Sequence, residues 1–357
     1  MAFAIPTSMQ AIALDKYSKP SEYKLATLPT PEIQKPTEIL IKVHAASINP
    51  IDVKLANGMA KALSKDSFPF KIGYDVSGTV AAVGSSVTIF KVGDEIFSRV
   101  PGEYKGSVAE YVLSIEDAVA HKPAKLSFSE AASIPLAALT ALQCMEVADQ
   151  TVGGLKGKTV LVPAGLSGTG SFAVQLAKNV FGAAEVITTL STGKIPKAKE
   201  LLGEDTFTAI DYTKEDVAKA VGKGKVDYLF DTMATTMSLL GAVKKGGVIV
   251  SISTMPSGDQ MRDGGMPDMP VFIRYVMNLV DWFFRSWTGW AGVNYKYIFM
   301  HPSRTGLDKL SEYIQEGKIT PIVGRTAKFS DIEAIRTGCG EIYDGKGGIG
   351  KFVIEMV

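Results

Sequence analysis

An apolar run, a glycine-rich turn and an apolar helical pattern follow one another without interruption between Gly157 and Lys178. The run from Thr159 to Pro163 is rich in valine and leucine, which is typical of a parallel strand buried on both faces. From Ser171 to Phe181 apolar residues recur at helical spacing, and Gly182 follows where a helix end favours glycine. This order predicts one strand-turn-helix unit of a parallel α/β sheet.

The turn in this unit has the composition of a phosphate cradle. Glycines reach backbone angles closed to other residues and let a pyrophosphate approach the free N–H groups of a helix N-terminus. The spacing departs from G-x-G-x-x-G, because a frame that begins at Gly165 puts Ser167 at the middle glycine, and the frame from Gly168 starts late. The flanking strand and helix favour a dinucleotide over an ordinary tight turn. The candidate cradle residues are Gly165, Ser167, Gly168, Thr169 and Gly170.

The next predicted strand, from Val186 to Ser191, indicates which nicotinamide cofactor is bound. NAD sites usually carry an acidic residue about twenty positions beyond the glycines. Glu185 is the acid at that distance, but it is expected to precede the strand and so to lie at its wrong end. After the strand come Ser191, Thr192 and Lys194, and hydroxyls with a cation suit a ribose 2′-phosphate. We therefore predict NADPH, although Lys194 is alternatively an ordinary solvated loop lysine.

The length of the chain predicts two domains, because 357 residues exceed the size at which a single core stops growing. Residues 1–125 carry short alternating strands with Gly and Pro turns, which are typical of a compact β-rich domain. Residues 126–300 alternate strands with helices, which predicts a doubly wound parallel sheet.

Charge and cysteine content narrow the class of protein. The 38 basic and 37 acidic residues nearly cancel, so the chain has no basic field for nucleic acid. Its two cysteines, Cys144 and Cys339, argue against a disulfide scaffold and for a reducing compartment. The N-terminal segment lacks the basic flank and apolar core of a secretory signal. These features predict a cytoplasmic protein.

An aromatic segment from Val271 to Trp290 is about long enough to cross a bilayer. Arg274, Asp281 and Arg285 interrupt it, and on a helix they gather on one face where Asp281 and Arg285 can pair. The segment therefore predicts an amphipathic helix and no membrane span. Two uses remain open, namely a surface helix packed on the protein or a lid over an apolar substrate cleft.

Four further motifs carry a resemblance to a known family. The segments Gly73–Gly84 and Val87–Ser98 resemble the signature of the medium-chain dehydrogenase/reductase superfamily. Ala45–Lys54 and Ser129–Gln143 resemble its zinc-free quinone oxidoreductase branch. The glycine-rich stretch and the aromatic segment most resemble fungal quinone-reductase-like proteins, including the trans-acting enoyl reductases of polyketide pathways.

The resemblance implies a GroES-like catalytic domain built from residues 1–125 and 301–357, with the Rossmann NADP(H)-binding domain in residues 126–300. The active site is expected between them, and a homodimer is compatible with the family. The positions of the family's catalytic zinc ligands hold Asn49, Tyr74 and Leu136, which form no zinc site. Chemistry through a zinc alkoxide is therefore not expected.

Without a metal, hydride transfer suits an enone, an enoyl thioester or a quinone, whose carbonyl oxygen takes up charge and needs a hydrogen-bond donor. Lys54 stands where related quinone reductases place a tyrosine, and its ammonium could be this donor or simply a solvated lysine. Tyr74 could supply a phenol instead, or be a core tyrosine. By resemblance Asn49 and Asp52 lie beside the nicotinamide, although Asp52 alternatively holds its turn together.

The resemblance assigns three more cofactor contacts, which are Thr140, Tyr212 and Ser253. Together these features predict a zinc-independent, NADPH-dependent reductase of activated C=C bonds or quinones that acts on a small molecule. The alternative is an NADPH-binding sensor or interaction protein of the same fold with little catalytic activity.

Overall fold

The computed structural model describes residues 4–63, 66–264, 269–346 and 348–356. The chain divides into two compact units. Unit 1 comprises Met1–Leu139 and His301–Val357, and unit 2 comprises Thr140–Met300. Helix α3 (Pro135–Val152) contains the first division, so one continuous helix belongs to both units.

Unit 1 is built mainly from antiparallel strands. A three-stranded sheet has the order β2-β1-β4, and a seven-stranded sheet has the order β15-β16-β3-β5-β6-β8 with β7 also paired to β3. The strands are β1 (Ser8–Leu14), β2 (Lys24–Pro29), β3 (Glu38–Ile48), β4 (Phe70–Lys71), β5 (Asp75–Val83), β6 (Glu95–Arg99), β7 (Tyr111–Ile115), β8 (Val119–His121), β15 (Val323–Lys328) and β16 (Lys351–Glu355). The other helices of unit 1 are α1 (Pro50–Ala56), α2 (Phe128–Ala132), α10 (Arg304–Gln315) and α11 (Ile332–Tyr343).

Strand β3 organises the core of unit 1. Its alternate residues Ile39, Ile41 and Val43 are buried in one apolar cluster, as the period of two in a strand requires. The C-terminal strand β16 pairs antiparallel with β3 and adds Phe352 and Ile354 to the same cluster. This pairing is why the C-terminal segment belongs to the N-terminal unit.

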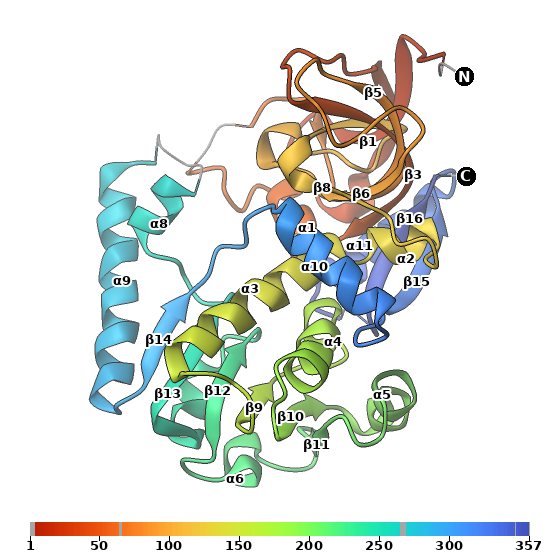
Figure 1. Ribbon diagram of the computed structural model, residues 1–357. Helices are drawn as coiled ribbons and strands as arrows, with labels where there is room; N and C mark the ends of the chain where they lie inside the picture. Colours follow the sequence, from red (N-terminus) through yellow and green to blue (C-terminus); the bar gives the residue numbers. More distant parts are fainter. Residues whose placement is uncertain (1–3, 64–65, 265–268, 347, 357) are drawn as a thin grey trace. The chain divides into compact units, whose positions relative to one another are not determined.

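Unit 2 contains one six-stranded parallel sheet in the order β11-β10-β9-β12-β13-β14 (Figure 1). Its strands are β9 (Thr159–Val162), β10 (Glu185–Leu190), β11 (Thr208–Asp211), β12 (Val226–Asp231), β13 (Val243–Ser251) and β14 (Asn294–Tyr297). Its remaining helices are α4 (Gly168–Gln175), α5 (Ile195–Leu202), α6 (Val217–Val221), α7 (Thr236–Leu239), α8 (Gly258–Asp263) and α9 (Val271–Trp290). The chain runs outward from β9 to β11 and then returns to β12 on the other side of β9. The predicted doubly wound sheet is confirmed, and its strand order reverses between β9 and β12.

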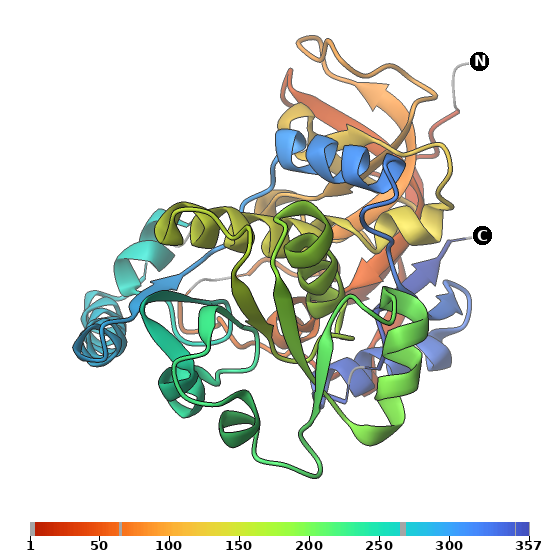
Figure 2. The same cartoon turned by 60° about the horizontal axis from the view of Figure 1, so that its bottom comes forward.

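Helix α9 is the predicted amphipathic helix, and its bounds agree with the aromatic segment. Figure 2 shows α9 nearly end-on beside β14, with which it is in contact. Throughout the described parts of the chain, no helix combines the length and the apolar character that crossing a membrane requires.

Candidate functional site

The turn between β9 and α4 shows why a serine stands at the middle position of the glycine pattern. Ser167 is the N-cap of α4, and its Oγ accepts the N–H of Gly170 at 3.0 Å. A serine in this place satisfies one of the first helical N–H groups, which have no acceptor within the helix. The helix therefore begins at Gly168, three residues before the predicted start at Ser171.

Two of the three glycines in the turn are required by close packing. A Cβ on Gly170 would lie 2.2 Å from the carbonyl oxygen of Ala164, and a Cβ on Gly165 would lie 2.1 Å from Oγ1 of Thr188. Neither distance leaves room for a methyl group. The turn is therefore held tightly against the neighbouring strand β10.

Two threonines of β10 anchor the same turn and were missed by the sequence prediction. The hydroxyl of Thr188 donates to the carbonyl oxygen of Val162 at 2.6 Å. Oγ1 of Thr189 accepts the N–H of Ala164 at 3.0 Å, where Ala164 has a φ of 56°. A polar pair within an otherwise buried strand was the available sequence signal.

The N-terminal end of α4 fits the pyrophosphate of a dinucleotide. Gly168 and Thr169 occupy its first turn at the carboxyl end of β9, where helix N–H groups and the helix dipole favour an anion. Because the hydroxyl of Ser167 accepts the N–H of Gly170, the N–H groups of Gly168 and Thr169 remain for the ligand. These residues would hold the phosphates of NADPH.

The residues assigned to the adenosine end of the cofactor, which carries the ribose 2′-phosphate, lie at the carboxyl ends of β10 and β11. These two strands pair in parallel. Ser191 directly follows β10, and Thr192 and Lys194 belong to the short 3-10 helix that starts there. Tyr212 directly follows β11, its N–H donates to the carbonyl oxygen of Leu190 at 3.2 Å, and its side chain is exposed. The structure therefore brings these four predicted residues to one corner of the sheet.

An acid that the sequence prediction left out lies at this corner. Asp211, the last residue of β11, accepts hydrogen bonds from the hydroxyls of Thr192 and Thr213 and pairs with Lys214 at 3.7 Å. The hydrogen bond from Thr192 and then that from Thr213 lower the pKa of the Asp211 carboxyl, which is therefore ionised. This acid comes from the adjacent strand β11, whereas the sequence prediction considered only β10. Glu185 is the first residue of β10, within the strand, and lies at its opposite end as predicted.

The predicted nicotinamide residue Ser253 lies beside the ends of β12 and β13. Its hydroxyl donates to the carbonyl oxygen of Asp231 at 3.0 Å and accepts the N–H of Ala234 at 2.6 Å. The fully buried carboxylate of Asp231 accepts from the N–H groups of Thr235 and Thr236. Ser253 therefore helps to shape this edge of the sheet. Thr140 is buried within α3.

Unit 1 contains a buried polar cluster around Asn49. The Asn49 N–H donates to Oδ2 of Asp52 at 2.6 Å, and its Nδ2 donates to Oδ2 of Asp75 at 2.9 Å. Nζ of Lys351 donates to the carbonyl oxygen of Ile48 at 3.1 Å and to Oδ1 of Asn49. The Asn49 amide thus has a donor and an acceptor partner that fix its orientation. Asp52 has the turn-holding role that the sequence left open.

The electrostatics of this cluster favour a neutral Asp52. Burial, and then the charge of Asp75, raise the pKa of Asp52 to about 7, against the opposing effects of the Asn49 N–H and Lys351. Its Oδ1 has no hydrogen-bond partner among the described residues. Burial lowers the pKa of Lys351, while Asp75 and Asp52 oppose that shift.

The two proposed donors, Tyr74 and Lys54, lie in different surroundings. Tyr74 is nearly buried, its ring lies 4.5 Å from the Arg99 guanidinium carbon, and burial raises its pKa to about 12. It is therefore a neutral phenol at physiological pH. Lys54 is exposed on α1, whereas Asp52 and Val53 on the same helix are buried. The structure does not bring Lys54 into the buried cluster.

The three positions aligned with the zinc ligands meet around Asp75. Its Oδ1 accepts the N–H of Leu136 at 2.9 Å, its Oδ2 accepts Nδ2 of Asn49, and Tyr74 precedes it in the chain. These positions carry an alkyl group, an amide and a phenol, which are poor zinc ligands. In the parts of the chain that the structure describes, no group of three or more His, Cys, Asp or Glu residues could hold a metal.

Two family models match the chain, and they agree with the β-rich structure of unit 1 and the parallel sheet of unit 2. Residues 35–124 match the alcohol dehydrogenase GroES-like domain, and residues 202–336 match the zinc-binding dehydrogenase model. These matches and the two sheets confirm the predicted fold class of a GroES-like β-rich part and a Rossmann parallel sheet.

Characterised proteins resemble the chain over most of its length. The 2-methylene-furan-3-one reductase of Solanum lycopersicum is 35% identical over 92% of this chain and 75% of the relative. The chloroplastic NADPH-dependent alkenal/one oxidoreductase of Arabidopsis thaliana is 33% identical over 91% of this chain and 74% of the relative. The structure of the quinone oxidoreductase from Coxiella burnetii has a TM-score of 0.80 and 31% identity, and the match covers 98% of this chain and 100% of that one.

Proposed function

Because the chain belongs to the medium-chain dehydrogenase/reductase superfamily, in its quinone-oxidoreductase-like branch, we propose that it is a zinc-independent reductase that uses NADPH. Its substrates are activated C=C bonds, as in an enone or an enoyl thioester, or quinones. The observation that carries the proposal is the chemistry around Asp75, where an amide, a phenol and an alkyl group occupy the aligned zinc positions. A substrate reduced there must already be activated, because an amide, a phenol and an alkyl group are poor ligands for a zinc ion that would otherwise polarise it.

The cofactor assignment rests on unit 2 and on the relatives. The turn from Gly165 to Gly170 would hold the pyrophosphate, and Ser191, Lys194 and Tyr212 would surround the ribose 2′-phosphate. The ionised carboxylate of Asp211 accepts hydrogen bonds from Thr192 and Thr213, which partly compensate its negative charge. The bound cofactor supplies the hydride. NADPH also appears in the name of the Arabidopsis relative.

The role of unit 1 is to stabilise the substrate oxygen and supply a proton. Negative charge develops on the carbonyl oxygen when the β carbon accepts hydride, and a hydrogen-bond donor there lowers the barrier. Tyr74 is a neutral donor over the physiological range, because its pKa is raised to about 12. Lys54 is the alternative donor, and Asn49 is held rigidly by Asp52, Asp75 and Lys351.

The names of the relatives agree with this substrate class. A 2-methylene-furan-3-one and an alkenal or alkenone both contain a C=C bond conjugated to a carbonyl group, and a quinone is a conjugated diketone. We extend this class to the present chain, together with a small-molecule substrate and a cytoplasmic location.

The test is steady-state consumption of NADPH with an enone, an enoyl thioester and a quinone. We expect turnover with at least one of them, at a rate that is unchanged after chelator treatment and dialysis. NADPH binding is measured separately by nicotinamide fluorescence. Tight binding without turnover on all three substrates would instead support the sensor alternative, and loss of turnover with the chelator would contradict zinc independence.

A further inference from the structure

Helix α9 presents a broad apolar face outward. Nine large apolar side chains of this helix are exposed, and Phe272, Leu279 and Trp290 are 77%, 63% and 90% exposed. We call this set the aromatic face; its members are Val271, Phe272, Tyr275, Val276, Leu279, Trp282, Phe283, Trp287 and Trp290. Six of the nine are aromatic, and they extend along a helix of 20 residues, about 30 Å long.

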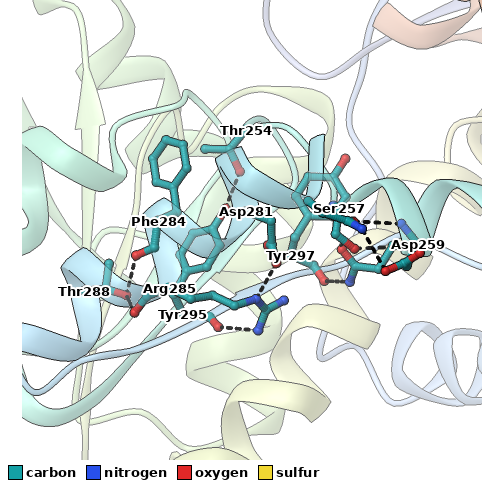
Figure 3. Close-up of polar contacts among 11 residues, drawn as sticks. Thr254, Ser257, Asp259, Asp281, Phe284, Arg285, Thr288, Tyr295 and Tyr297 are labelled. Carbon is teal, nitrogen blue, oxygen red and sulfur yellow. Dashed lines mark hydrogen bonds and ion pairs between the residues drawn. The ribbon is translucent and has the colours of Figure 1, made fainter. Parts of the chain in front are cut away.

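The opposite face of α9 meets unit 2 through apolar and polar groups. Met277 is buried, and the ring of Phe284 stacks on that of Tyr295 with centroids 5.7 Å apart. Nε of Arg285 donates to Oδ2 of Asp281 at 2.6 Å, and NH1 of Arg285 donates to the carbonyl oxygen of Tyr295 at 3.4 Å (Figure 3). Thr288 is fully buried, and its hydroxyl donates to the carbonyl oxygen of Phe284 at 2.8 Å. Two polar side chains of the helix, Asp281 and Thr288, are therefore buried against the protein.

Contacts with α8 fix the other half of the helix. Nδ2 of Asn278 donates to Oδ2 of Asp259 at 2.9 Å, and the Asp259 N–H donates to Oδ1 of Asn278 at 3.1 Å. Arg274 pairs with the same carboxylate at 3.6 Å. Polar contacts along both halves of α9 thus set its rotation, and rotation of the aromatic face inward would break them.

The aromatic face is large enough for a stable interface. An aromatic side chain offers about 150–250 Å² of surface, so the six exposed aromatic residues present on the order of 600–1,000 Å² at their exposed fractions. The largest apolar patch on a typical monomer is about 300–600 Å². A standard protein interface buries about 800 Å² on each partner. The face therefore has the area that one side of a dimer needs.

The spacing of the aromatic face is also self-complementary. Three pairs of its residues lie at equal separations from Asp281, and these are Phe272 with Trp290, Tyr275 with Trp287, and Leu279 with Phe283. A two-fold axis at the level of Asp281 would bring each residue of a pair against the other member in an antiparallel copy. This reciprocity is what an isologous interface requires.

Charge favours a second copy over a lipid surface. Helices that bind membranes at the interface combine an apolar face with basic residues that attract anionic lipid. The two basic residues of α9 are Arg274 and Arg285, and both are paired with acids. We propose that the aromatic face of α9 binds the same face of a second copy of this chain, with the two helices antiparallel.

The first test is the oligomeric state of the full chain, measured by sedimentation over a concentration series. We expect a dimer, and we expect Leu279→Glu to weaken it at least 100-fold because a charge is placed beside the two-fold axis. Val92→Glu, an equivalent change at an exposed apolar residue of unit 1, should leave the dimer intact. Unchanged NADPH binding by both variants shows that they are folded.

A second test uses complementary charges. Phe283→Lys should also weaken the homodimer, but a mixture of the Leu279→Glu and Phe283→Lys proteins should form a heterodimer, because the two positions face each other across the axis. A wild-type chain that stays monomeric at about 100 μM, or a Leu279→Glu variant that still dimerises, would overturn the proposal. A monomer that floats with phosphatidylcholine vesicles would assign the aromatic face to a bilayer instead.

Discussion

At the residue scale, the buried polar cluster of unit 1 determines what Asn49 can do. Its Nδ2 is committed to Asp75 and its Oδ1 to Lys351, so the side chain is held in one orientation. Asp52 fixes the backbone of the same residue. A group fixed in this way can position a ligand, whereas the exposed Lys54 has the freedom of a surface side chain.

Exchange of Lys54 separates the two candidate donors. If its ammonium protonates the substrate or stabilises the enolate, Lys54→Met should reduce turnover about 100-fold, because general acid catalysis typically contributes at least that factor. The affinity for NADPH, measured by fluorescence, should not change. Lys91→Met, at another exposed lysine of unit 1, is the control. Undiminished turnover would reject Lys54 and leave Tyr74 as the donor.

At the scale of elements, the strand, turn and helix from β9 to α4 could be predicted because their signals are local. The apolar run, the glycines and the helical period all lie within about twenty residues, and the structure confirms the strand and the helix. The anchoring by Thr188 and Thr189 could not be predicted in this way. It depends on which strand lies beside β9, and that is decided by the pairing of the sheet.

Replacement of Gly170 tests whether the close packing of the turn is needed for stability and for NADPH binding. A Cβ there would lie 2.2 Å from a backbone oxygen, so the first turn of α4 must shift in Gly170→Ala. We expect a loss of about 1–3 kcal/mol in the free energy of unfolding, as for overpacking elsewhere, and at least a 10-fold weaker affinity for NADPH. Gly241→Ala is the control, since no atom lies within 4 Å of the added Cβ. Equal NADPH affinity in the two variants would contradict the proposal that this turn binds the pyrophosphate.

At the scale of the whole molecule, the two units differ in how their segments are joined. The parallel sheet of unit 2 uses one continuous stretch, whereas unit 1 combines both ends of the chain through the pairing of β16 with β3. The family match and the resemblance to a known branch were correctly predicted from motifs. The residues assigned to catalysis and to cofactor binding stay predictions.

The stability of the molecule should depend on pH through Asp52. Its pKa in the folded protein is about 7, against 3.8 ordinarily, so the folded state holds the proton more tightly than the unfolded chain does. Protonated Asp52 therefore stabilises the folded state. This stabilisation is fully present below about pH 4, is lost as the pH rises toward 7, and does not change further above that.

Asp52→Asn tests this dependence, because the amide is neutral at every pH and its oxygen can still accept the Asn49 N–H. Chemical denaturation from pH 4 to pH 8 should show a smaller decline in unfolding free energy for the variant, by on the order of a few kcal/mol. Asp117→Asn, at an exposed acid of unit 1, should follow the wild type. Parallel curves for Asp52→Asn and the wild type would contradict a raised pKa.

The sequence by itself determined the secondary structure around the cradle, the doubly wound sheet and the two faces of α9, because backbone angles and side-chain periodicity are set by neighbours in the chain. Only the tertiary structure decided the cluster that joins Asn49 to Asp75 and Lys351, which are separated from it by 26 and 302 residues. It also decided which face of α9 points outward. Periodicity divides a helix into two faces, but the inward one is chosen by the groups it meets, and here those include polar partners and the ring of Tyr295.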